Sequence, residues 1–168
     1  MSRFLKGIAL LAGALLIQIL VSHRVPWIQR SVDLVLLVVV FYGSSGSRVG
    51  AMTVGAVGGL LEDVWFGDLM GLHGFTKTLI GYLLGNLGSR FELTSPGARI
   101  LAVLAATIIE KAVEPAVLIG LGVPASFDLA DMAWRCAGNT LAGAIFFFAL
   151  AGAKEIPSKS RKRRVVAT

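Results

Sequence analysis

The chain has 168 residues, of which 55% are hydrophobic and only 15% charged. Its mean hydropathy is +0.77, and soluble domains carry about 25% charged residues, so this composition excludes an ordinary soluble domain and indicates a protein embedded in lipid. The net charge of +6 does not indicate a nucleic-acid-binding protein, because many basic residues cluster without aromatic neighbours in a C-terminal tail suited to anionic lipid headgroups: Lys154, Lys159, Arg161, Lys162, Arg163 and Arg164.

Six apolar segments follow one another along the chain. A membrane-spanning helix needs about 20 apolar residues, and the predicted spans are residues 5–21, 33–47, 49–66, 71–88, 98–120 and 129–152. The first segment resembles a signal peptide but has no cleavage site, so we expect it to remain as a span. The second is the shortest, and whether it crosses fully is open. We predict an all-α integral membrane protein: a six-helix transmembrane domain over residues 1–153 and a basic tail over residues 154–168.

The distribution of lysine and arginine predicts the orientation of these spans. With six spans, Arg24 and Arg30 are the basic residues of one side, whereas both basic termini, Arg48 and Arg90 fall on the other. Basic loops stay in the cytoplasm. We therefore expect a multi-pass protein of the bacterial inner membrane with both termini in the cytoplasm.

Small residues recur every four positions within the predicted spans. Such rows let helix backbones approach closely inside a membrane. They serve either packing within the chain or a face for a partner, and both readings remain open. The rows are Ala51, Gly55 and Gly59; Gly81 and Gly85; Ala102 and Ala106; and Gly138 and Ala142.

Charged residues within the spans predict a buried network, because each costs about 2.5–3.5 kcal/mol at the centre of a helix facing lipid. Glu110, Lys111 and Glu114 share one stripe of the fifth span with Thr107, at 100° per residue. Four further charges lie at a similar depth toward the outer side: Glu62, Asp63, Lys77 and Arg135. Structural ion pairs, an outward ligand site and a docking site for a partner are the alternatives.

Within this layer we expect Arg135 to pair with Glu114 or Glu110, which lie at similar depth on the neighbouring span. No nucleophile or histidine accompanies the carboxylates, His23 and His73 stand alone, and Cys136 is the only cysteine. We therefore predict no catalytic residues, no metal and no cofactor.

The outer connection between the third and fourth spans carries acidic and aromatic residues together. Trp65 and Phe66 suit the headgroup level of a membrane, and Glu62, Asp63 and Asp68 surround them. This segment serves either as an interfacial anchor or as the docking edge for a partner.

The stretch from Gly55 to Phe75 resembles the rod shape-determining protein MreD family. Its glycine-spaced apolar residues lead to Asp63, and Leu69-Met70-Gly71-Leu72 then stands where the family has Leu-Gly-Leu at the start of the next span. Asp33-Leu-Val-Leu-Leu upstream and Tyr82-Leu-Leu-Gly downstream also fit. The resemblance covers about residues 33–90.

The resemblance implies a non-enzymatic scaffold of the cell-elongation machinery, which supports peptidoglycan synthesis and cell shape. Its implied partners are MreC, the RodA and penicillin-binding protein 2 complex and, indirectly, MreB. The expected partner or helix-packing residues are Ala51, Gly55, Gly59, Asp63, Trp65, Gly71, Gly81 and Gly85. The family is also similar in architecture to the substrate-binding subunits of energy-coupling-factor transporters, so the alternative function is a subunit that binds a vitamin-type small molecule.

Overall fold

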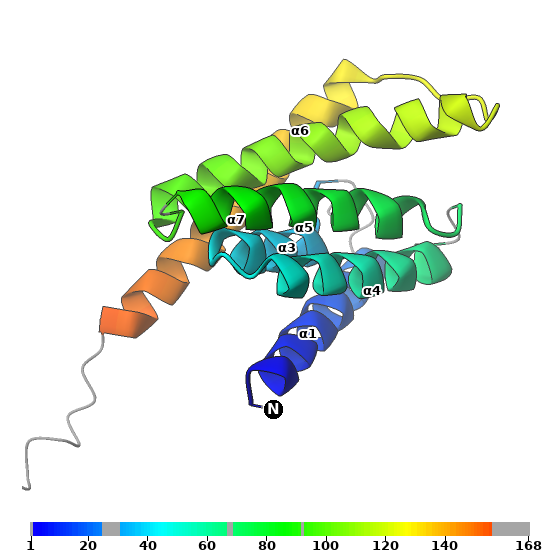
Figure 1. Ribbon diagram of the computed structural model, residues 1–168. Helices are drawn as coiled ribbons and strands as arrows, with labels where there is room; N and C mark the ends of the chain where they lie inside the picture. The colour runs from blue at the N-terminus through cyan, green and yellow to red at the C-terminus, as the bar shows by residue number, and fades with distance from the viewer. Residues whose placement is uncertain (1, 25–30, 67–68, 92, 156–168) are drawn as a thin grey trace, which may run out of the picture.

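The computed structural model describes residues 2–24, 31–66, 69–91 and 93–155, and this part of the chain is all-helical (Figure 1). The helices are α1 (Ser2–Arg24), α3 (Leu34–Ser44), α4 (Arg48–Phe66), α5 (Leu72–Arg90), α6 (Pro96–Gly120) and α7 (Leu129–Glu155). The predicted all-α class is therefore confirmed, and each helix overlaps one predicted span. Of the predicted basic tail, residues 156–168 lie outside the described residues, as do Arg30 and Asp68.

Two of the described helices are long and apolar enough to cross a membrane. These are α4 and the stretch Leu129–Gly152 of α7. Shorter apolar stretches occur at Ala9–Val21 within α1 and at Leu34–Ser44, which is α3. The complete six-span arrangement remains a prediction.

The short helix α3 forms the centre of the bundle. Its 11 residues extend about 16 Å, which is about half of a hydrocarbon core some 30 Å thick. Six consecutive side chains, Val35 to Val40, are buried, and α3 contacts α1, α4, α5 and α6. A helix that is apolar on every side is stable only when neighbours surround it. The second predicted span, which is the shortest, thus corresponds to a central helix that its neighbours enclose.

Helices α4 and α5 form an antiparallel pair in which glycines bring the two backbones together (Figure 1). A Cβ atom on Gly55 would meet the carbonyl oxygen of Lys77, and one on Gly59 would lie 2.5 Å from the backbone nitrogen of Gly74. From the other side, a Cβ on Gly81 would lie 2.6 Å from the Ala51 carbonyl oxygen. Gly55 and Gly59 thus pack α4 against the backbone of α5, which already fills the space beside them.

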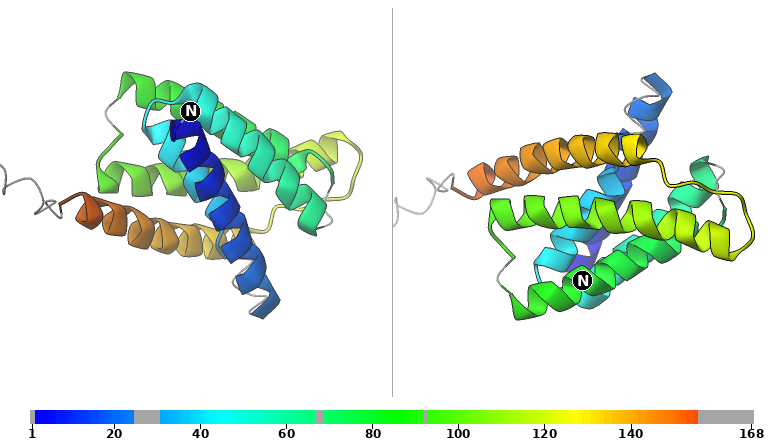
Figure 2. Two further views of the ribbon diagram at one scale, coloured as in Figure 1. Left: turned by 90° about the horizontal axis from the view of Figure 1, so that it is seen from below. Right: turned by 90° about the horizontal axis from the view of Figure 1, so that it is seen from above.

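Helices α6 and α7 form a second antiparallel pair, seen side by side in the right-hand view of Figure 2. On α7, a Cβ on Gly138 would clash with the carbonyl oxygen of Ser31, so this glycine admits the extended segment that leads into α3. Ala102 and Ala106 of α6 are buried in the same core as Val35 and Val39 of α3. The predicted small-residue rows therefore serve packing within the chain.

Helix α1 crosses the bundle obliquely and contacts α3 and α4 (Figure 2). The α4–α5 and α6–α7 connections lie at the same end of the bundle as the start of α3 (Figure 1). We call this end the predicted outer end, because the distribution of lysine and arginine places it outside the cytoplasm.

Candidate functional site

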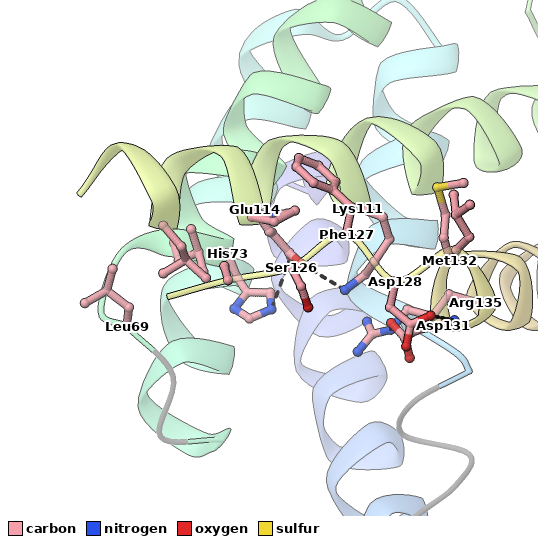
Figure 3. Close-up of a pocket in the computed structure, with 15 residues that line it drawn as sticks. Leu69, His73, Lys111, Glu114, Ser126, Phe127, Asp128, Asp131, Met132 and Arg135 are labelled. Atoms are coloured by element: carbon pink, nitrogen blue, oxygen red, sulfur yellow. Dashed lines mark hydrogen bonds and ion pairs between the residues drawn. The ribbon is translucent and has the colours of Figure 1, made fainter. Parts of the chain in front are cut away.

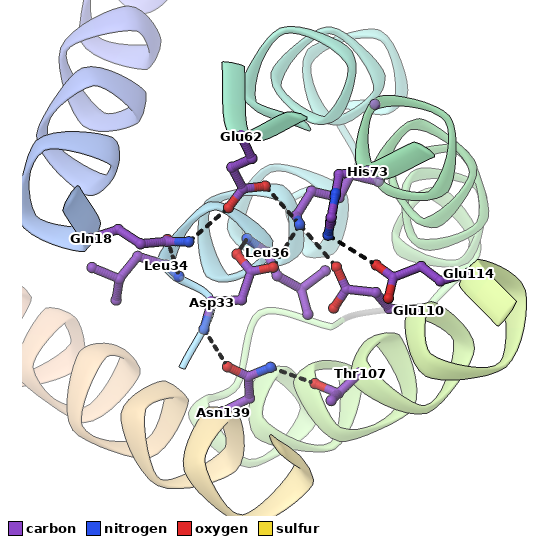
Figure 4. A network of polar contacts seen from close by, with 12 residues as sticks. Gln18, Asp33, Leu34, Leu36, Glu62, His73, Thr107, Glu110, Glu114 and Asn139 are labelled. Atoms are coloured by element: carbon purple, nitrogen blue, oxygen red, sulfur yellow. Dashed lines mark hydrogen bonds and ion pairs between the residues drawn. The ribbon is translucent and has the colours of Figure 1, made fainter. Parts of the chain in front are cut away.

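Lys77 of α5 lies at the centre of a buried cluster of charges. The side chains of Asp33, Glu62 and Glu110 converge in this cluster (Figure 4). Its Nζ atom lies 2.6 Å from Asp33 Oδ2, 2.7 Å from Glu62 Oε2 and 2.9 Å from Glu110 Oε1. The four side chains are between 0 and 5% exposed. An ammonium group has three N–H donors, and here each faces a carboxylate from a different element: the start of α3, α4 and α6.

Two amide side chains connect this cluster to the remaining helices. Gln18 of α1 donates from Nε2 to Glu62 Oε1 at 2.8 Å, and its Oε1 accepts from the backbone N–H of Leu34 at 2.9 Å. The Gln18 amide thus uses both its donor and its acceptor, as is usual for buried polar groups. We call Asp33, Glu62, Lys77 and Glu110 the central cluster.

Asn139 of α7 makes the second connection. Its Oδ1 accepts from the backbone N–H of Asp33 at 2.7 Å, and its Nδ2 donates to Thr107 Oγ1 of α6 at 3.1 Å (Figure 4). With Gln18 included, each described helix places a side chain or its capping residue in one polar network. Such a network fixes the rotation and depth of every helix, since an unmatched polar group costs more here than in water.

The central cluster contains more acidic than basic side chains. Three carboxylates surround one ammonium group, and Glu110 Oε2 is buried without a hydrogen-bond partner. Asp33 also receives the N–H of Leu36 at 2.8 Å as the N-cap of α3, which places it at the positive end of that helix. The ammonium of Lys77 is therefore the principal charge that holds these carboxylates together.

Asp63, one residue after Glu62, caps the start of α5 from the neighbouring helix. Helix α5 begins after Gly71, whose φ of 94° suits glycine and whose position provides no capping side chain. The Asp63 carboxylate accepts the backbone N–H groups of Gly71 at 2.8 Å, His73 at 3.1 Å and Gly74 at 3.3 Å. The α4–α5 connection is thereby tied down at a helix terminus that otherwise lacks acceptors.

His73 lies between two acidic side chains. Its Nδ1 is 2.8 Å from Asp63 Oδ1, and its Nε2 is 3.4 Å from Glu114 Oε1. Glu114 Oε2 also accepts from Lys111 Nζ at 2.9 Å. The structure therefore links α4, α5 and α6 through a chain of four charged or titratable groups, and the interpretation of His73 as isolated is wrong.

Arg135 does not contact Glu110 or Glu114, and the predicted pairing is wrong. Glu110 faces Lys77, and Glu114 is occupied by Lys111 and His73. Arg135 Nε lies 3.8 Å from Asp131 Oδ2, one turn earlier on the same helix. Glu114 and Arg135 line the same pocket, but α6 directs Glu110 and Glu114 toward side chains of α5.

A pocket with a volume of about 360 Å³ opens beside His73 at the predicted outer end (Figure 3). Its walls are the first turn of α5, the second half of α6, residues 125–128 and the first two turns of α7. Lys111, Glu114 and Arg135 face it together with apolar side chains. Trp65, by contrast, is exposed on α4 and lies outside both the pocket and the central cluster.

Several residues of the polar network were missed at the level of sequence. Gln18 and Asn139 are single amides within apolar spans, and a polar residue inside a span was the signal that could have identified them. Asp33 was read as the start of a span and as part of the family resemblance, but not as a member of the charge network. Among the described residues, no group of three or more His, Cys, Asp or Glu is arranged to hold a metal ion.

Comparison with known proteins gives the family of the chain. No curated protein and no solved structure matches it. The model of the family described as rod shape-determining protein MreD matches residues 1–151, which include the central cluster, the His73 chain and the pocket. The chain therefore belongs to the MreD family of rod shape-determining proteins.

Proposed function

We propose that this chain is a non-enzymatic membrane scaffold that binds MreC and supports peptidoglycan synthesis during the elongation of rod-shaped cells. The observation that carries the proposal is the family match over residues 1–151, which indicates a role in rod shape determination. The central cluster supports it, because Lys77 pairs with all three carboxylates and the four side chains are closed to solvent. Such a core suits a rigid scaffold.

The proposed topology has six membrane crossings in the bacterial inner membrane and both termini in the cytoplasm. The antiparallel pairs α4–α5 and α6–α7 support it, as does the scarcity of basic residues at the predicted outer end. Alkaline phosphatase fused after Thr168 should be inactive, and the same enzyme inserted within residues 122–127 should be active. The opposite pattern would overturn the topology.

The docking surface for MreC is, in this proposal, the apolar edge formed by Leu61, Val64, Trp65, Leu69 and Met70, which we call the α4–α5 edge. These side chains are exposed on both sides of the connection that Asp63 ties to α5. A fixed edge loses little conformational entropy on binding, and exposed tryptophans often dominate binding energies. The carboxylate of Asp63 itself is turned inward and caps α5.

The chain provides a matched control for this surface, because Trp65 and Trp134 are both 55% exposed. Trp65 lies on the α4–α5 edge and Trp134 near the start of α7. We expect Trp65→Ala to weaken co-purification with MreC about tenfold or more, as loss of a dominant contact does, and Trp134→Ala to leave it unchanged. Equal recovery of MreC with wild type and Trp65→Ala, at equal protein levels, would contradict this surface.

The cellular consequence is tested in a strain depleted of its own MreD. The proposal places RodA, penicillin-binding protein 2 and, indirectly, MreB downstream of MreC binding. The Trp65→Ala chain should therefore insert at normal levels but leave the cells rounded, whereas Trp134→Ala should restore rods. Restored rods with Trp65→Ala would mean that MreC binds elsewhere or that the chain acts without it.

A further inference from the structure

The pocket at the predicted outer end has no role in the scaffold proposal. Its volume of about 360 Å³ falls in the range of small-molecule sites, which is about 300–1,000 Å³. It lies between α5, α6 and the start of α7, and Leu69 of the α4–α5 connection also lines it (Figure 3). A pocket of this size between packed helices leaves room for a ligand of the chain.

The acidic side chains of the pocket already have partners. Glu114 is paired with Lys111 at 2.9 Å and lies near His73. Asp128 accepts the backbone N–H groups of Ala130 at 2.8 Å and Asp131 at 3.3 Å, and so caps the start of α7. These carboxylates are balanced by a lysine and by a helix N-terminus, respectively.

Arg135 is the poorly partnered charge of the pocket. Its closest carboxylate among the described residues is that of Asp131, whose side chain is 40% exposed and lies 3.8 Å away, beyond hydrogen-bonding distance. The Nε atom is buried and makes no hydrogen bond. A guanidinium has five donors in a planar fork that fits two oxygens of a phosphate or carboxylate.

Apolar side chains make up most of the remaining pocket wall, beside His73, Lys111 and Ser126. Leu72, Pro115, Leu118, Phe127 and Met132 line it, and these side chains cannot solvate a free ion. An occupant must therefore combine an anionic group with hydrocarbon. The pocket lies at the ends of helices α5, α6 and α7, at the level where lipid headgroups meet hydrocarbon in the proposed topology.

From these contacts we propose that the pocket binds an anionic phospholipid of the outer leaflet, with its phosphodiester held by Arg135 and the start of its acyl chains on the apolar wall. The pocket and the α4–α5 edge share Leu69, but Arg135 lies outside the edge and Trp65 lies outside the pocket, so variants at these two residues test the two sites separately. The same chemistry could come from a water-soluble phosphate ester, and the experiment separates the two sources.

The test uses the full chain, purified in detergent and stripped of lipid. Short-chain phosphatidylglycerol, the corresponding diacylglycerol and glycerol phosphate are added separately, and binding is followed by native mass spectrometry and by the thermal unfolding temperature. We expect phosphatidylglycerol to bind and to raise the unfolding temperature, and both other compounds to bind at least tenfold more weakly, because charge-assisted hydrogen bonds to phosphate contribute about 1.5–3 kcal/mol. Equal binding of glycerol phosphate would assign the site to a soluble ester and overturn the lipid assignment.

Two variants address the pocket in different ways. Arg135→Gln removes the guanidinium charge, and Ala125→Trp fills the pocket from its loop while keeping Arg135. Both should weaken phosphatidylglycerol binding about tenfold or more. The control is Arg90→Gln, which removes an exposed arginine at the opposite end of α5. If Arg135→Gln fails to fold, Ala125→Trp decides alone.

The readouts also separate a binding role from a structural one. A binding role predicts that Arg135→Gln unfolds at the wild-type temperature without lipid, because Arg135 makes no hydrogen bond within the described residues. It also predicts that added phosphatidylglycerol stabilises wild type more than this variant. Unchanged lipid binding in Ala125→Trp, or an equal lipid-induced shift in wild type and Arg135→Gln, would refute the proposal.

Discussion

Replacing Lys77 with methionine removes the ammonium group that three buried carboxylates share, while keeping most of the volume of the side chain. Asp33, Glu62 and Glu110 then lie close together without their counter-charge. Because all three oxygens are within 2.9 Å of Lys77 Nζ, no two of them are more than about 6 Å apart, a range over which like charges repel strongly in a low-dielectric interior. The substitution thus converts the most enclosed ion-pair group of the described chain into an uncompensated one.

The expected magnitude follows from the burial of these groups. Removing one member of a buried ion pair costs about 3–5 kcal/mol, because the remaining charge stays desolvated. Lys77 and Glu110 are completely buried, so solvent screening does not reduce this figure. A loss of about 3–5 kcal/mol lowers the ratio of folded to unfolded protein roughly 100- to 4,000-fold, at 1.4 kcal/mol for each factor of ten.

The assay is reversible unfolding of the purified chain in mixed micelles, followed by tryptophan fluorescence. Lys111→Met is the matched control, because Lys111 also pairs with a glutamate at 2.9 Å but is partly exposed and lies only three residues away on the same helix. The Lys111–Glu114 pair is partly reached by solvent, whereas Lys77 and Glu110 are completely enclosed. We therefore expect Lys77→Met to destabilise the protein more, in free energy of unfolding, than Lys111→Met.

A rescue variant tests whether charge, and not shape, causes the loss. Adding Asp33→Asn, Glu62→Gln and Glu110→Gln to Lys77→Met removes every charge of the central cluster and keeps its shape. Neutralising a whole buried ion group is often neutral or stabilising, so most of the lost stability should return. Equal stability of Lys77→Met and Lys111→Met, or no recovery in the neutral variant, would refute the reasoning.

Three further substitutions test the packing and the caps. Gly55→Ala should destabilise the bundle by about 1–3 kcal/mol through overpacking against the α5 backbone, whereas Gly13→Ala, with open space around its Cβ, should be neutral or stabilising in the same unfolding assay. Asp63→Ala should cost about 2 kcal/mol or more and increase amide hydrogen exchange at the start of α5, because three N–H groups lose their acceptor; unchanged exchange would contradict the capping role. Asn139→Leu should cost about 1–3 kcal/mol by leaving the Asp33 N–H without its acceptor, and wild-type stability in this variant would show that another group replaces the bond.

The sequence by itself determined the helices and the side of each helix that carries charge. Six apolar segments separated by glycine- and serine-bearing breaks predicted the observed helix order, since an apolar run of this length has few other stable forms. Thr107, Glu110, Lys111 and Glu114 were placed on one stripe of α6, and the structure buries all of them except Lys111, which is partly exposed. This was predictable because the helical repeat of 3.6 residues depends on no other part of the chain.

Only the tertiary structure decided which charges meet. Lys77 pairs with Glu110, which lies 33 residues later in the chain. Arg135 lies near Asp131 of its own helix. His73 lies between Asp63 and Glu114. The position of a residue along a span can be counted from the sequence, and this count predicted one common layer for the charged residues. Partner choice depends instead on how each helix is rotated about its axis and which helices are neighbours. Those two quantities are set by the packing of all helices at once, here by the close α4–α5 contact at Gly55 and Gly59 and by α3 at the centre.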